Sequence, residues 1–82
     1  MKLPVIRHFQ KNHSEEALEH TIEVLESFSE HRSATETDLD VIGELITNLC
    51  GAIEVKQMIA DGQSERDAAN AFAKKVLGSI DQ

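Results

Sequence analysis

The residues best suited to chemistry are three polar side chains near the start of the chain, His13, Glu16 and His20. Their spacing of three and four residues would place them on adjacent turns of one helix face, where imidazole and carboxylate groups can share a metal such as zinc. The same spacing arises often by chance in a chain with 15 acidic residues and four histidines. We therefore expect a solvated polar face with no cofactor, and keep a metal- or small-ligand-binding regulatory protein as the alternative.

Catalytic chemistry has few other candidates in this sequence. Cys50 is the only cysteine, and its place inside the apolar segment 41–53 predicts a buried, inert thiol, with a reactive or redox thiol as the alternative. All four histidines fall within the first 31 residues, which does not favour a nucleophile and base around Cys50. No histidine has a glutamate three residues before it, as di-iron helical bundles require. We expect that the protein is not an enzyme.

The elements that carry these residues are expected to be helices, because apolar residues recur at spacings of three and four and no alternating strand pattern occurs. Ser14 is placed to cap the second helix, and either Thr35 or Thr37 to cap the third. Gly62 marks the end of the third helix, and Ser64 the cap of the fourth. The predicted helices of this single 82-residue domain cover residues 4–12, about 15–30, 38–60 and 65–80.

The third of these helices holds the segment VIGELITNLCGAI at 41–53, which has one charged residue. A helix that is apolar on nearly every side needs neighbours on every side, and a chain of this size buries only about 60% of its surface alone. We therefore expect an all-α bundle of three to four helices around one long central helix. It should have a C-terminal helical hairpin and form a homodimer.

Small residues on the same helix indicate where another helix could approach closely. Gly43, Thr47 and Gly51 recur every four residues, and glycine inside a helix costs about 1 kcal/mol relative to alanine. The close contact could be internal or between subunits. The residues expected at this interface are Gly43, Leu45, Ile46, Thr47, Leu49 and Gly51.

The net charge of −7 disfavours nucleic acid as a partner, because Lys and Arg supply most of the affinity for phosphates. The turn before residues 65–80 could also be read as a helix-turn-helix, but that helix begins Glu65, Arg66, Asp67 and offers few groups to base edges. The second predicted helix carries a one-sided row of glutamates, which suggests a basic protein partner. The basic residues 2–11 are expected to pack on this acidic body or on a second copy.

No signal peptide or membrane-spanning run is expected, since residues 1–10 hold no long apolar stretch and no segment reaches about 18 apolar residues. We expect a cytoplasmic protein without membrane contact. Its function is expected to lie in protein contacts, as a homodimeric interaction or regulatory module.

Three segments also resemble a family of short acidic bacterial proteins catalogued only as a domain of unknown function. They are MKLPVI at the start, DLDVIGELITNLCGAIEV in the middle and VLGSID near the end, so the resemblance covers essentially the whole chain. It implies a stand-alone helical protein of the cytoplasm. It assigns no activity, substrate or catalytic residue.

Overall fold

The computed structural model describes residues 2–80, which form four helices. They are α1 (Leu3–Asn12), α2 (Glu15–Ser29), α3 (Glu36–Ala60) and α4 (Glu65–Ile80). No strand occurs between residues 2 and 80, so the expected all-α fold around a long central helix is confirmed. Within this range no helix combines the length and the apolar character needed to cross a membrane.

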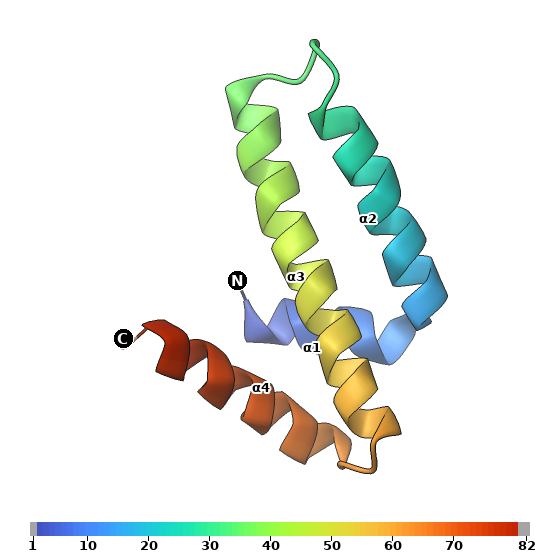
Figure 1. The fold of residues 1–82 in the computed structure, drawn as a ribbon, viewed down its shortest axis with the longest axis vertical. Helices are drawn as coiled ribbons and strands as arrows, with labels where there is room; N and C mark the ends of the chain where they lie inside the picture. The colour runs from blue at the N-terminus through green and yellow to red at the C-terminus, as the bar shows by residue number, and fades with distance from the viewer. Residues whose placement is uncertain (1, 81–82) are drawn as a thin grey trace.

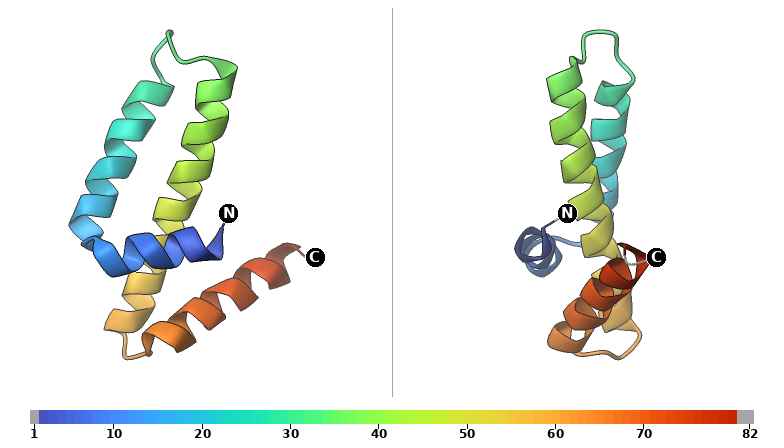
Figure 2. Two further views of the ribbon diagram at one scale, coloured as in Figure 1. Left: turned by 180° about the vertical axis from the view of Figure 1, so that it is seen from behind. Right: turned by 90° about the vertical axis from the view of Figure 1, so that its left-hand side faces the viewer.

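The helices are arranged around α3 as a hub (Figure 1). α2 and α3 form an antiparallel hairpin, α1 crosses the middle of α3, and α4 folds back along its C-terminal half before diverging from it (Figures 1 and 2). The molecule measures 42 × 31 × 17 Å. The N-terminal half of α3 lies beside α2, away from α1 and α4 (Figure 1).

The caps explain where the helices begin. Ser14 Oγ accepts a hydrogen bond from the backbone N–H of Ala17 at 3.1 Å, as its position predicts. At α3 the structure selects Thr35 rather than Thr37. Thr35 Oγ1 accepts from the N–H of Asp38 at 3.1 Å, and the Asp38 carboxylate accepts from the N–H of Thr35 at 3.1 Å. This reciprocal pair starts the helix at Glu36, two residues before the predicted position.

A tight turn joins α3 to α4. Gly62 has a φ of +110°, in the region that glycine adopts without a steric penalty. The N–H of Gln63 donates to the carbonyl of Met58 at 3.2 Å, which closes the end of α3. Ser64 Oγ then accepts from the N–H of Asp67 at 3.1 Å and caps α4. The predicted C-terminal helical hairpin is confirmed.

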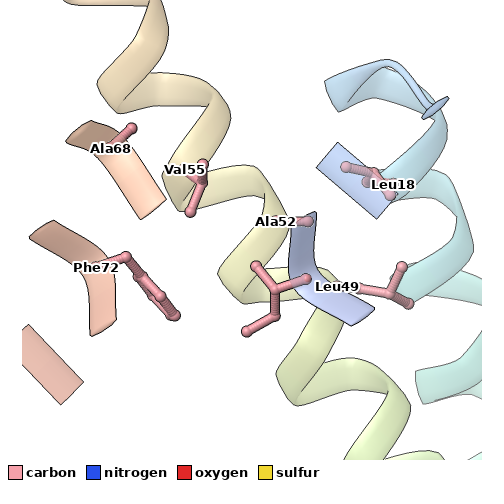
Figure 3. Packing of buried hydrophobic residues seen from close by; sticks show 7 residues of the cluster. Leu18, Leu49, Ala52, Val55, Ala68 and Phe72 are labelled. Atoms are coloured by element: carbon pink, nitrogen blue, oxygen red, sulfur yellow. The ribbon is translucent and has the colours of Figure 1, made fainter. Parts of the chain in front are cut away.

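The core lies where α1, α2 and α4 meet α3 (Figure 3). Its buried members come from all four helices: Ile6, Leu18, Leu49, Ala52, Val55, Ala68 and Phe72. The helix α1 is docked on α3, because the backbone N–H of Lys2 donates to Asn48 Oδ1 at 3.0 Å and Lys56 Nζ donates to the carbonyl of Gln10 at 2.9 Å. The basic N-terminal helix thus packs on its own chain, which is one of the two arrangements expected from the sequence.

A candidate interaction face

A shallow apolar groove lies where α1 meets the α2–α3 hairpin. It has a volume of about 350 Å³. Its lining comes from three helices: Phe9, His13, Ala17, Leu18, Thr21, Leu25, Leu45 and Leu49. Among these lining residues only His13 and Thr21 have polar side chains, whereas ligand pockets fix polar molecules with several convergent groups. The groove is therefore suited to apolar side chains.

Three exposed apolar residues continue this face toward the loop between α2 and α3. Val24, Phe28 and Val41 are 68%, 42% and 55% exposed, and we call them the apolar patch. Val24 and Phe28 follow Thr21 by three and seven residues, and Val41 precedes Leu45 by four, so each lies on the same side of its helix as the groove lining. Exposed apolar residues beside an apolar groove are typical of an association site.

The charged residues of α2 lie on its other side. Its exposed glutamates follow each other at spacings of three and four residues: Glu16, Glu19, Glu23, Glu26 and Glu30. We call them the acidic face. The groove lining and the apolar patch contain no Asp, Glu, Lys or Arg. These residues therefore offer uncharged side chains to another molecule, despite the net charge of −7.

Some of the predicted interface residues are buried within the chain, and others lie near its surface. Gly51 is buried, and a Cβ atom there would lie 2.9 Å from Ile6 Cδ1 and 3.0 Å from Phe72 Cζ. Leu49 is also buried within the chain, so for these two residues the close contact is internal. An added Cβ at Gly43 would meet nothing within 4 Å. Among residues 2–80 no other helix therefore approaches α3 closely at Gly43, and a contact there between subunits stays a prediction.

The other members of that set lie nearer the surface. Thr47 is exposed, and its hydroxyl donates to the carbonyl of Gly43 at 2.8 Å. Leu45 and Ile46 are half-buried, and Leu45 lines the groove. A role for Leu45 and Ile46 between subunits stays a prediction.

The proposed metal ligands do not form a site. His13 lies at the C-terminal cap of α1, whereas Glu16 and His20 belong to α2, so the three do not share one helix face. Their side chains are all exposed. Among residues 2–80, no three His, Cys, Asp or Glu side chains are placed to hold a metal ion together. His13, Glu16 and His20 are therefore not placed to share one metal ion.

The position of Cys50 also differs from the prediction, because the residue is exposed rather than buried. Its neighbours in sequence, Leu49 and Gly51, face the core, and Cys50 points away between them. Partial burial raises the pKa of the Cys50 thiol, and the Glu26 carboxylate raises it further. The thiol thus stays protonated near neutral pH, which is the opposite of what a nucleophilic cysteine needs.

The fold and this face define a small all-α protein with an apolar groove beside an apolar patch. The chain belongs to a family of unknown function, DUF6952, whose family model matches residues 1–81. The resemblance to a family without an assigned activity is thereby confirmed. No curated protein and no solved structure matches the chain.

Proposed function

We propose that this protein is a homodimeric interaction module and not an enzyme. The observation that carries the proposal is its surface area of 5712 Å². A compact monomer of 9.1 kDa exposes about 4900 Å², so the chain exposes about 800 Å² more than its mass requires. That excess equals the share of one partner in a protein interface of standard size, about 800 Å².

The shape of the chain supports the same proposal. The radius of gyration is 13.7 Å, whereas about 11.7 Å is expected for a compact domain of 82 residues. The extra extension comes from the α2–α3 hairpin, which projects beyond α1 and α4 (Figure 2). A projecting hairpin with an apolar side gains stability when a second molecule covers that side.

The acidic face gives such a dimer a second surface. It lies on the side of α2 away from the groove, so dimerisation through the groove would leave it in solvent. A basic protein is the partner that its charge favours, with attraction that weakens as salt rises. We propose that the dimer binds such a partner in the cytoplasm and acts there as a regulatory or adaptor protein.

Native mass spectrometry of the untagged protein tests the proposal, because one spectrum reports the subunit number and any retained metal or small ligand. Light scattering behind size exclusion, from 1 to about 100 µM, gives the monomer–dimer equilibrium within the usual range of weak to tight homodimers. We expect a dimer free of metal. A monomer across the whole range would overturn the proposal, and a monomer with one bound metal or ligand would favour the alternative function.

A further inference from the structure

We propose that two copies pair face to face through their α2–α3 hairpins, so that the apolar patch of each copy fills the groove of the other. The two-fold axis runs across the hairpins, perpendicular to their helices and in the plane between the two faces. The result is a four-helix bundle at the centre of the dimer. This inference depends on the proposed homodimer and adds its contact face and geometry.

The placement of the patch and the groove carries the first step of the argument. Both lie on one side of the hairpin, but the groove is at the end where α1 crosses and the patch is toward the α2–α3 loop. Along α2 their centres are separated by about six residues, or about 9 Å at 1.5 Å per residue. In a two-fold interface, if residue i of one copy contacts residue j of the other, then residue j of the first copy also contacts residue i of the second. A two-fold axis across the hairpins exchanges their two ends. The patch of each copy therefore meets the groove of the other, and this contact is made twice.

The other two-fold arrangement is less favourable. An axis parallel to the hairpin would keep the ends together, with patch against patch and groove against groove. Two projecting patches would then hold the faces apart and leave both grooves empty, which forfeits packing contacts. The transverse axis instead places side chains such as Phe28 opposite a hollow lined by leucines.

The distribution of charge favours the same axis. Residues 2–13 at the α1 end carry three basic residues and no acidic residue. The loop end carries Glu30, Glu36, Asp38 and Asp40 against Arg32 alone. The transverse axis brings the basic end of each copy to the acidic end of the other. The parallel axis would bring the two acidic ends together, which costs free energy through like-charge repulsion.

A matched pair of substitutions on α3 tests the contact face. Val41 and Leu39 are both exposed apolar residues, 55% and 43%, two residues apart on the same helix but on different sides. Because Val41→Glu would bury a charge in each half of the interface, we expect the dimer dissociation constant to rise at least about 100-fold. Leu39→Glu should leave it within about threefold. Circular dichroism of both variants verifies that the helices are retained.

The outcomes separate the inference from the proposed function. If the wild type is a dimer and Val41→Glu dissociates it while Leu39→Glu does not, the face is supported. A dimer that survives Val41→Glu and Val24→Glu would overturn the face while leaving the homodimer intact. A monomeric wild type would overturn both.

Disulfide cross-linking tests the axis. The transverse axis passes close to Val24, so this residue should lie near its own counterpart in the partner, within the Cα separation of about 4.4–6.8 Å that a disulfide needs. In a Cys50→Ser background, we expect Val24→Cys to form a covalent dimer under mild oxidation and Leu39→Cys to remain monomeric on a non-reducing gel. If Val24→Cys does not cross-link alone but does so when mixed with Val41→Cys, the parallel axis is correct and our axis is wrong.

Discussion

Replacing Gly51 with alanine places a methyl group between α1 and α4. Its Cβ would lie 2.9 Å from Ile6 Cδ1 and 3.0 Å from Phe72 Cζ. Both side chains are buried, so moving either one means shifting the residues packed around it. Overpacking of this kind costs about 1–3 kcal/mol, whereas alanine gains about 1 kcal/mol over glycine in a helix. We expect Gly51→Ala to lower the free energy of unfolding by about 1 kcal/mol, and Gly51→Leu to lower it further.

Gly43→Ala is the matched control, because the same helix receives the same methyl group with nothing within 4 Å. Only the helix propensity then changes, and we expect the free energy of unfolding to rise by up to about 1 kcal/mol. The two variants should therefore differ by about 2 kcal/mol, with opposite signs.

Urea unfolding followed by circular dichroism measures both values by linear extrapolation. All samples need one protein concentration, since association adds to the apparent stability. If Gly51→Ala stabilised the protein as much as Gly43→Ala, then α1 and α4 would not converge at Gly51, and the core described above would be incorrect.

Three further predictions concern single side chains. Gln10 Oε1 is buried with no hydrogen-bond partner among residues 2–80, and such a group costs about 1–3 kcal/mol. Gln10→Met should therefore raise the free energy of unfolding by about 1 kcal/mol in urea titrations; a loss of stability would contradict this. Thr35→Ala should lower it by about 1 kcal/mol and speed amide exchange in the first turn of α3, whereas Thr37→Ala should change neither. Iodoacetamide should label Cys50 slowly at neutral pH, and Glu26→Gln should lower the pKa of Cys50 and speed labelling by less than about tenfold. Since the folded state holds the Cys50 proton more tightly, this thiol makes stability fall as the pH rises past its ordinary pKa of 9.0. Unchanged labelling in Glu26→Gln would argue against an effect of the Glu26 carboxylate on this thiol.

The helices could be predicted from the sequence because their signals are local. Ser14, Gly62 and Ser64 act on the backbone of their own turn, and each functions in the structure as its position indicates. The start of α3 is ambiguous in the sequence because two such local signals occur two residues apart. Thr35 and Thr37 each have an aspartate three residues later, and only the geometry of the loop decides between them.

The groove and the surroundings of Cys50 could not be predicted in this way. Periodicity describes one helix, whereas the groove depends on how α1 crosses the hairpin and brings Phe9 beside Leu45 and Leu49. In the sequence of α2, Ala17 and Val24 widen the apolar stripe, and this is the one feature that indicates a second apolar side. Apolar neighbours similarly suggested that Cys50 is buried, although α3 is covered by different helices at different heights and its side at Cys50 remains open.

The meeting of Ile6 and Phe72 at Gly51 has a consequence for the order of folding. The two side chains lie near opposite ends of the sequence, and both lie against Gly51, so bringing them to this point closes a loop that contains most of the chain. The α2–α3 hairpin needs only neighbouring segments and can form early, whereas the contact at Gly51 must wait for a long loop to close. The step that completes the core should therefore be the slow one in refolding. Removal of α1 should therefore also destabilise the packing of α4 on α3, although α1 and α4 lie farthest apart in the sequence.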